Sequence, residues 1–366
     1  MVYKKIIRPI LFSIPPDTIH KIVAGSGEFT SRIPGVSSVV GRSLTVKNPI
    51  LQTIVDGITF PNPVGLSAGF DKEGIYTGFI HMMGFGHMEL GSITNHAYAG
   101  NPKPWIRRLP RNKSLVINYG LKSRGVGQFI RQLQKRKPYG PYGISIAKSN
   151  DAACVGQAGI EDVASTLRTV APFGDWHTIN LSCPNTSDGT TFMDPGQLDT
   201  LCKRLAEVRG EYGITKPWYL KINPDISTTH MDELIEIARR HDVRGFVIGN
   251  LMKDTQKAKR LLAFPEEYNE QWNGSLSGSV VREASNNLIQ YTYQKTHGSL
   301  TIIGCGGIFT AKDAYEKISL GASVVQMITG FVYGGPATIR RINHGLVAML
   351  RANGHTSIAS LRGSTK

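Results

Sequence analysis

Short apolar runs rich in β-branched residues alternate with longer amphipathic segments through most of the chain after Phe60. The segments between the runs, such as Thr229–His241 and Thr310–Leu320, have the three- and four-residue spacing of helices. Alternating strands and helices pair in parallel through right-handed crossovers, and eight such units close a barrel. We therefore predict an α/β fold, a (β/α)₈ TIM barrel over residues 46–350. The eight expected strands lie around Val64–Ala68, His87–Gly91, Gly143–Ala147, His177–Ser182, Trp218–Ile222, Gly245–Gly249, Leu300–Gly304 and Ser323–Ile328.

The first 45 residues have a different pattern, in which apolar clusters alternate with isolated lysines and arginines. Pro15, Pro16 and Asp17 predict a turn into a second helix with proline in its first turn. We expect a small N-terminal helical extension over residues 1–45 and a C-terminal tail over residues 351–366. Two short amphipathic helices with basic flanks suit a protein that rests on an anionic membrane. A helix pair packed on the protein's own core would give the same pattern.

The charge balance favours an anionic partner. The chain has 42 Lys and Arg against 27 Asp and Glu, a formal net charge of +15. Eleven basic residues and no acidic residue lie between Asn101 and Lys137. No nucleic-acid-binding motif accompanies them, so we expect solvated side chains, a membrane surface or small anions rather than nucleic acid.

The cysteines and the apolar runs narrow the class of protein further. Cys154, Cys183, Cys202 and Cys305 are far apart, with no CxxC pair and no histidine at ligand spacing. This pattern predicts no metal site and no disulfide framework, and it favours a reducing compartment. No apolar run approaches the roughly 18 to 20 residues that span a bilayer, and no cleavable signal peptide is predicted.

The active site of such a barrel lies at the carboxyl ends of its strands, where this sequence places glycines and polar residues. Gly304, Gly306 and Gly307 follow the seventh strand, and Thr329 and Gly330 follow the eighth. Their bare backbone N–H groups predict a phosphate cradle, although a tight turn would use the same residues.

Lys221 ends an otherwise apolar strand, where an unpaired ammonium group would be costly to bury. The position suits the electron-rich edge of a reduced flavin, whose developing negative charge the lysine would stabilise. A salt bridge to a barrel carboxylate, Asp225 or Glu89, is the alternative.

The segment Asn180–Asn185 places two asparagines around Ser-Cys-Pro just after a predicted buried strand. Asparagine offers both a donor and an acceptor, as an imide- or amide-bearing substrate requires. Cys183 between them is a candidate base or nucleophile, and an inert buried thiol is the alternative. The polar loop that follows could open to admit substrate and close to exclude water.

Several motifs together resemble the dihydroorotate dehydrogenases from about Asn62 to Gly335. They are GLSAGFDKEG, MGFGHMELGSIT, NLSCPNT, LKINPD, GSLSG, IIGCGGI and GASVVQMITGF. The N-terminal PPDTIHK stretch resembles the helical extension of the quinone-linked class 2 branch, which forms a hydrophobic tunnel from the membrane to the flavin.

The resemblance implies FMN-dependent oxidation of (S)-dihydroorotate to orotate in de novo pyrimidine biosynthesis, with a membrane quinone as electron acceptor. It also implies a peripheral membrane protein at the cytoplasmic face of the bacterial inner membrane. An oxidoreductase of the same fold acting on another small carbonyl or pyrimidine compound is the first alternative. A non-catalytic flavin-binding protein is the second.

The resemblance assigns roles residue by residue. Cys183 would remove a proton from C5 of dihydroorotate, and Arg108 would face the quinone end. The implied substrate contacts are Lys72, Asn118, Asn185 and Asn250. The implied FMN contacts are Ala68, Gly69, Ser92, Ser145, Asn180, Lys221, Gly249, Gly278, Gly306, Gly307, Thr329 and Gly330.

The sequence departs from the family pattern near the substrate. The class 2 branch usually has serine where Cys183 stands, and a thiol ionises far more readily than a hydroxyl. The segment NYGLKSRG, Asn118–Gly125, is shorter than the corresponding family loop and lacks its Arg and Phe. The other positions that depart from the family pattern are Trp105, Gly249, Leu251 and Ile328.

Overall fold

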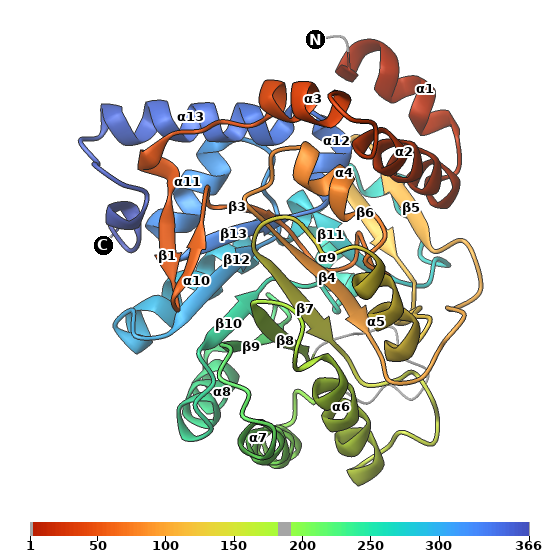
Figure 1. Cartoon of the computed structure of the whole chain (residues 1–366), viewed down its shortest axis with the longest axis vertical. Coiled ribbons are helices and arrows are strands. Elements are labelled where there is room, and N and C mark those ends of the chain that lie inside the picture. Colours follow the sequence, from red (N-terminus) through yellow and green to blue (C-terminus); the bar gives the residue numbers. More distant parts are fainter. Residues whose placement is uncertain (1–2, 182–191, 366) are drawn as a thin grey trace.

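Eight parallel strands close a barrel, which confirms the predicted fold and all eight expected strands (Figure 1). The computed structural model describes residues 3–181 and 192–365. The barrel strands pair in chain order, and the last closes the ring by pairing with the first. They are β3 (Val64–Leu66), β4 (His87–Ile93), β7 (Tyr142–Ile146), β8 (Trp176–Asn180), β9 (Trp218–Ile222), β10 (Gly245–Ile248), β12 (Thr301–Cys305) and β13 (Val324–Met327).

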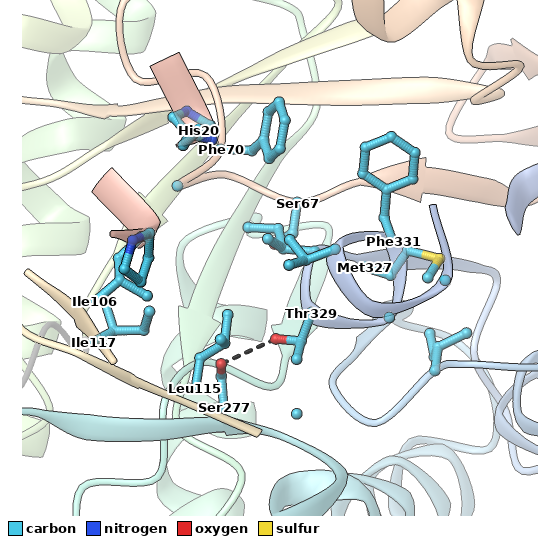
Figure 2. Close-up of a pocket in the computed structure, with 18 of the residues that line it drawn as sticks. His20, Ser67, Phe70, Ile106, Leu115, Ile117, Ser277, Met327, Thr329 and Phe331 are labelled. Carbon is cyan, nitrogen blue, oxygen red and sulfur yellow. Dashed lines mark hydrogen bonds between the residues drawn. The ribbon is translucent and has the colours of Figure 1, made fainter. Parts of the chain in front are cut away.

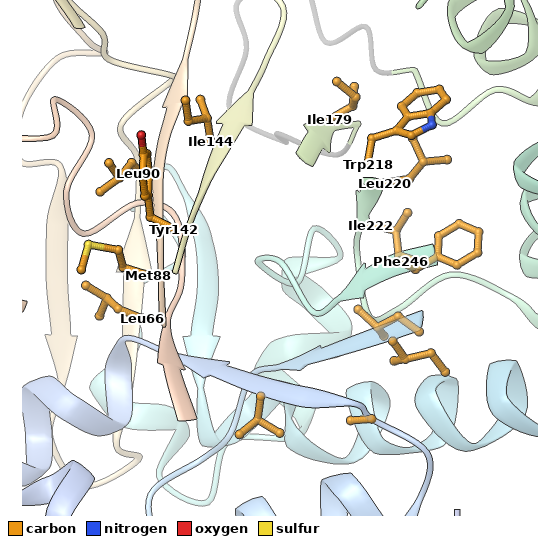
Figure 3. Close-up of a cluster of buried hydrophobic side chains, with 14 of the residues drawn as sticks. Leu66, Met88, Leu90, Tyr142, Ile144, Ile179, Trp218, Leu220, Ile222 and Phe246 are labelled. Carbon is orange, nitrogen blue, oxygen red and sulfur yellow. The ribbon is translucent and has the colours of Figure 1, made fainter. Parts of the chain in front are cut away.

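Amphipathic helices surround the barrel because each buries one apolar stripe against the strands. Helix α8 (Thr228–Arg240) is typical: Leu234, Ile235 and Ala238 are buried, and the Ser227 hydroxyl accepts from the backbone N–H of His230 at its start. Figure 3 shows Leu90 and Ile144 of the strands within this core. The other helices that follow barrel strands are α4 (Thr77–Met82), α5 (Val126–Lys135), α6 (Gln157–Val170), α7 (Pro195–Glu211), α9 (Thr255–Arg260), α10 (Arg282–Thr296), α11 (Ala311–Ser319), α12 (Thr329–Gly334) and α13 (Thr338–Ala352).

A short hairpin, β1 (Thr53–Val55) and β2 (Ile58–Phe60), covers the amino-terminal end of the barrel. Phe60 packs against Trp176, the first residue of β8, with ring centroids 5.9 Å apart. Asp56 in the turn accepts hydrogen bonds from Tyr219 and Thr301. The hairpin therefore leaves the opposite, carboxyl end of the barrel for the active site.

His87, the first residue of β4, is buried in this apolar end, and its protonation state can be tested. Neither of its ring nitrogens has a hydrogen-bond partner among the described residues, and burial lowers its pKa to about 3. The imidazole is neutral in the folded state but gains a proton in the unfolded chain below its usual pKa near 6.5. Folding stability is therefore present above pH 6.5 and is lost as the pH falls toward 3.

We expect His87→Leu to remove this pH dependence. Between pH 6 and pH 4, the difference in unfolding free energy between wild type and variant should change by about 1.4 kcal/mol per pH unit. Denaturant titrations at a series of pH values measure it. Equal pH slopes for the two proteins would contradict the assignment of a neutral buried histidine.

A three-stranded antiparallel sheet lies over the carboxyl end of the barrel and was not predicted from the sequence. It consists of β5 (Ile106–Leu109), β6 (Ser114–Ile117) and β11 (Ser275–Gly278), with β6 in the middle. Much of the basic region between Asn101 and Lys137 thus forms β5, β6 and α5. Short 3-10 turns complete the barrel region at Pro49–Leu51, Pro265–Glu267 and Ser279–Val281.

The N-terminal segment forms three α-helices rather than the two expected. A π-turn at Tyr3–Ile7 leads into α1 (Arg8–Ser13), followed by α2 (Pro16–Ser31) and α3 (Val36–Leu44). Pro16 occupies the first turn of α2, as predicted. The three helices lie together at one edge of the barrel in Figure 1. Among the described residues, none of the helices combines the length and hydropathy needed to cross a bilayer.

Helix α2 is amphipathic, with one face on the protein and the other in solvent. On the inner face, Glu28 accepts from the backbone N–H of Phe79 at 3.1 Å and forms an ion pair with Arg136. On the outer face, Ile22 and Phe29 are 51% and 69% exposed. The inner face of α2 therefore packs on the protein, and its outer face exposes apolar side chains to solvent.

The chain after Ala352 packs on the barrel region. Ile358 and Leu361 are buried, and the last turn, Ala359–Leu361, is a 3-10 helix. The Ile358 N–H donates to the Ile50 carbonyl at 2.7 Å, and the Thr365 N–H donates to Ser319 at 3.0 Å.

Candidate active site

One elongated cavity of about 680 Å³ joins the N-terminal helices to the carboxyl ends of the barrel strands. Its volume lies in the range of about 300–1,000 Å³ that is typical of small-molecule and cofactor sites. Figure 2 shows His20 and Phe70 on one side of this cavity and Ser277 and Thr329 on another.

Most residues that the sequence predicted for the site line this one cavity. Asn118 and Ser145 are not among the lining residues, and Cys183 and Asn185 lie outside the described residues. The predicted residues that do line it are Ala68, Gly69, Lys72, Ser92, Arg108, Asn180, Lys221, Gly249, Asn250, Gly278, Gly306, Gly307, Thr329 and Gly330.

A chain of amide and hydroxyl groups crosses the floor of the cavity. Asn250 Nδ2 donates to Asn180 Oδ1 at 3.1 Å, and Asn180 Nδ2 donates to Ser92 Oγ at 2.9 Å. Ser92 Oγ lies 2.7 Å from Ser145 Oγ, which places Ser145 behind the lining layer. The network connects β4, β7, β8 and the end of β10, and it presents both donors and acceptors to a polar heterocycle.

Lys221 is buried at the floor, with its side chain only 4% exposed. Its Nζ donates to Ser67 Oγ at 3.1 Å and lies 3.9 Å from Glu89 Oε2. Of the two predicted carboxylates, Glu89 is therefore the ion-pair partner, whereas Asp225 accepts from the backbone N–H of Asp254. The salt bridge and the flavin-facing role are compatible, because Lys221 also lines the cavity.

The glycines after β12 and β13 stand where a side chain would collide with neighbouring protein atoms. Gly306 and Gly307 have φ angles of 95° and 72°, a region that favours glycine. A Cβ on Gly306 would lie 2.7 Å from Val281 Cγ2, and one on Gly330 would lie 1.8 Å from the Ile308 carbonyl oxygen. Beside them, Ser277 Oγ lies 3.0 Å from Thr329 Oγ1. Bare backbone at the ends of β12 and β13, with the paired hydroxyls of Thr329 and of Ser277 from β11, fits a phosphate group.

The shortened loop after β6 is held by its own contacts. Asn118 Oδ1 accepts from Asn101 Nδ2 at 2.9 Å, and Tyr98 OH donates to Asn101 Oδ1 at 2.9 Å. Lys72 Nζ lies 3.7 Å from the centroid of the Tyr119 ring, a cation–π contact. The structure thus brings Asn118 near the site through the loop, with its side-chain oxygen already bonded to Asn101.

Tyr119 and Asp17 link the barrel site to helix α2, and sequence reasoning missed both. Tyr119 OH donates to Asp17 Oδ1 at 3.2 Å, and the Trp105 backbone N–H donates to Asp17 Oδ2 at 3.2 Å. Burial and the Asp17 carboxylate raise the pKa of Tyr119, so the phenol stays protonated. No local signal distinguishes Asp17 from an ordinary first-turn acidic residue.

Arg108 lies where α1 meets the cavity. Its Nη1 donates to the carbonyls of Phe12 and Ile14, each at 2.9 Å, and its guanidinium carbon lies 4.4 Å from the centroid of the Phe12 ring. His20, which sequence reasoning also missed, lines the same end and packs edge-on against Phe70 with ring centroids 4.6 Å apart. Burial lowers the pKa of His20, which favours a neutral ring.

Comparisons with known proteins agree with this geometry. The family model described as dihydroorotate dehydrogenase matches residues 50–350. Dihydroorotate dehydrogenase (quinone) of Nostoc punctiforme is 33% identical over 373 residues, covering 99% of this chain and 98% of that protein. An enzyme of the same name from Thermus thermophilus is 34% identical over 355 residues, covering 96% of this chain and 98% of that protein.

Solved structures show the same architecture. The crystal structure of DHODH from Eimeria tenella in complex with ferulenol has a TM-score of 0.83 and 26% sequence identity, and it covers 95% of each chain. The ligand-free type from the same organism has a TM-score of 0.81 and 25% identity, over 95% of this chain and 99% of that one.

Proposed function

The chain belongs to the dihydroorotate dehydrogenase family, and we propose that it oxidises (S)-dihydroorotate to orotate with FMN and delivers the electrons to a membrane quinone. The reaction is an oxidation of a CH–CH bond in de novo pyrimidine biosynthesis. The observation that carries the proposal is the continuous cavity described above, which is apolar where it meets α1 and α2 and polar where it meets the barrel strands.

The barrel end of the cavity fits FMN. Gly278, Gly306, Gly307 and Thr329 would hold the phosphate, and Lys221 would face the ring system. When bound, the flavin supplies hydride acceptance from a carbon substrate and electron transfer to a second substrate. The contribution of Lys221 is a fixed positive charge in a dry site, where it stabilises negative charge that develops nearby. The wider set of proposed contacts is Ala68, Gly69, Ser92, Ser145, Asn180, Gly249 and Gly330.

The substrate would bind over the amide network of Asn180 and Asn250, with Lys72 as a cationic partner for its carboxylate. Asn118 and Asn185 complete the proposed contacts. Leu181 follows β8, its N–H donates to the Lys221 carbonyl of β9 at 3.1 Å, and the chain continues from it to Cys183. We assign Cys183 the removal of the C5 proton, because its thiol is the most readily ionised group in the sequence Asn180–Asn185.

The first 45 residues would admit the quinone from a membrane. Ile7, Leu11, Ile19 and Val23 supply apolar walls at this end of the cavity, and Arg108 is the polar group at the same end. Exposed apolar side chains lie outside, among them Ile10 and Phe29, and basic residues follow them along the chain. This composition suits peripheral association with an anionic bilayer, and we propose the cytoplasmic face of the bacterial inner membrane.

Two observations favour a second candidate, an oxidoreductase of the same fold with a different small substrate. The Asn118 side-chain oxygen is bonded to Asn101, and Leu251 lines the cavity beside Asn250. A substrate that needs fewer amide contacts than dihydroorotate would suit this arrangement.

Steady-state turnover tests the function as a whole. The purified protein with bound FMN is mixed with dihydroorotate and a long-chain quinone in detergent or vesicles, and orotate is followed by its absorbance. We expect orotate formation that depends on both compounds. Turnover of another cyclic carbonyl compound without orotate formation from dihydroorotate would favour the second candidate.

Narrowing the apolar end should impair the quinone half-reaction alone. Val23 lines the cavity and is 39% exposed, so Val23→Trp inserts a larger ring without disturbing a buried contact. We expect kcat/KM for a long-chain quinone to fall about tenfold, a cost of about 1.4 kcal/mol, with an unchanged rate of flavin reduction by dihydroorotate. The neighbouring Ile22→Trp is the matched control, because Ile22 is exposed and does not line the cavity. Equal kinetics for the two variants would contradict entry of quinone past α2.

A further inference from the structure

We propose that His96, Cys154 and Asp162 form a binding site for a thiophilic divalent cation, with Zn²⁺ as the best match. His96 lies in the segment after β4, Cys154 lies between β7 and α6, and Asp162 lies on α6. The three potential ligand atoms all lie within 4.8 Å of one another. Cys154 Sγ and His96 Nε2 each lie 3.7 Å from Asp162 Oδ1.

These separations match the edges of a zinc coordination tetrahedron. Zn²⁺ binds imidazole nitrogen and carboxylate oxygen at about 2.0–2.2 Å and thiolate sulfur at about 2.3 Å, so tetrahedral ligand atoms lie about 3.3–3.6 Å apart. The two distances to Asp162 Oδ1, 3.7 Å each, exceed this by a few tenths of an ångström, and the His96–Cys154 separation is within 4.8 Å. The His96 side chain is 61% exposed, so a small change of its side-chain torsions would bring its ring nitrogen to coordination distance.

The surrounding hydrogen bonds hold the ligand-bearing residues in place. Ser149 donates to Asp162 twice, from its backbone N–H to Oδ2 at 2.7 Å and from its hydroxyl to Oδ1 at 2.8 Å. The same hydroxyl accepts from the His96 backbone N–H at 3.0 Å, and Thr94 Oγ1 donates to the His96 carbonyl at 2.6 Å. One serine therefore positions both ligand-bearing segments, as outer-shell partners do in metal sites.

The chemistry of the three ligands selects the class of metal. A thiolate and an imidazole favour Zn²⁺ over Mg²⁺ or Ca²⁺, which prefer oxygen ligands. One thiolate and one carboxylate balance the two positive charges, and binding releases the Cys154 thiol proton to solvent. Cys154 and Asp162 are buried, whereas His96 is at the surface, so the fourth position faces water.

A bound cation would fasten two segments at the rim of the active-site cavity. The His96 segment continues from the strand that carries Ser92, and Asn150 Nδ2, four residues before Cys154, donates to the Gly120 carbonyl at 2.8 Å. Gly120 also lines the cavity. The site is distinct from the cavity itself, because its three ligands are not among the cavity-lining residues described.

Cobalt titration of the full-length protein with bound FMN tests the site. Tetrahedral Co²⁺ with a thiolate ligand gives ligand-field bands at longer wavelengths than the flavin absorbs. We expect the bands to saturate at one Co²⁺ per chain, Zn²⁺ to abolish them, and Zn²⁺ to raise the Tm of the wild-type protein. No bands and no Tm shift would overturn the proposal.

Matched variants assign the ion to these residues. His96→Ala and Cys154→Ala should lose the bands and the Tm shift, whereas His344→Ala and Cys202→Ala should keep both. His96 and His344 are both exposed, so loss of folding does not explain a difference between them. Bands that persist in His96→Ala and Cys154→Ala, or that are lost in Cys183→Ala, would place the ion elsewhere and overturn the proposal.

Discussion

A Cys183→Ala variant is expected to keep its FMN and to reduce it about 10²- to 10⁴-fold more slowly with dihydroorotate, because the substrate loses its proton acceptor. The predicted phosphate cradle at the ends of β12 and β13 does not include Cys183, so cofactor binding should survive. Anaerobic stopped-flow absorbance measures the reduction rate, and the visible spectrum of the purified variant measures FMN content.

Two companion variants separate the base from a general packing effect. Cys183→Ser should retain part of the activity with a more alkaline pH profile, because a hydroxyl ionises far less readily than a thiol with a reference pKa of about 8.5. Cys202→Ala removes a buried thiol on α7 and should leave the reduction rate unchanged. A wild-type rate in Cys183→Ala would remove Cys183 from the mechanism.

Lys221→Met should slow flavin reduction about 10²- to 10³-fold, because the site loses a preorganised positive charge at its floor. The Glu89 carboxylate, 3.9 Å from Lys221 Nζ, would also lose this cationic partner in a buried environment. We therefore expect weaker FMN retention together with the slower rate. Rapid-reaction reduction kinetics and FMN release on dilution measure the two effects.

Lys148→Met is the control for burial of a lysine. Lys148 is also buried at the carboxyl end of a barrel strand, where it donates to the Cys154 carbonyl at 2.9 Å, but it does not line the cavity. Its replacement should change stability without slowing reduction. Equal losses in both variants would mean that Lys221 acts through folding rather than through charge.

The barrel was predictable because its strands are buried on both faces. Runs such as Trp218–Ile222 and Gly245–Ile248 are apolar and short, and the helices between them keep a strong period. The sheet of β5, β6 and β11 gave no such signal. Its central strand β6 pairs antiparallel with β11, more than 150 residues away along the chain, and β5 carries Arg107 and Arg108 in a basic region. Tertiary contacts, and not the local residue pattern, determine where such strands form.

The floor of the site was predictable from the rule that strand ends meet at one edge of a barrel. Ser92 and Asn180 lie at the carboxyl ends of β4 and β8, Asn250 follows β10, and side-chain hydrogen bonds join the three. Contacts between the barrel and the N-terminal segment were not predictable, as the bond from Tyr119 to Asp17 shows. The roles of Cys183 and Asn185 remain predictions, because both lie outside the described residues.

Cysteine spacing also gave no signal for the cation site that we propose. Cys154 has no cysteine or histidine partner nearby in the sequence, yet the barrel brings His96 and Asp162 beside it from two different segments. Sequence spacing detects metal sites built on one loop or hairpin. It does not detect sites assembled by neighbouring βα units.

Anaerobic mixing of the purified protein with dihydroorotate, followed by addition of a long-chain quinone, tests both half-reactions of the proposed function. The absorbance of the oxidised flavin should bleach rapidly in the first step and return in the second. A flavin that stays oxidised with dihydroorotate, in protein that retains its FMN, would contradict the proposed substrate. A flavin that bleaches but is not reoxidised by quinone would contradict the proposed electron acceptor.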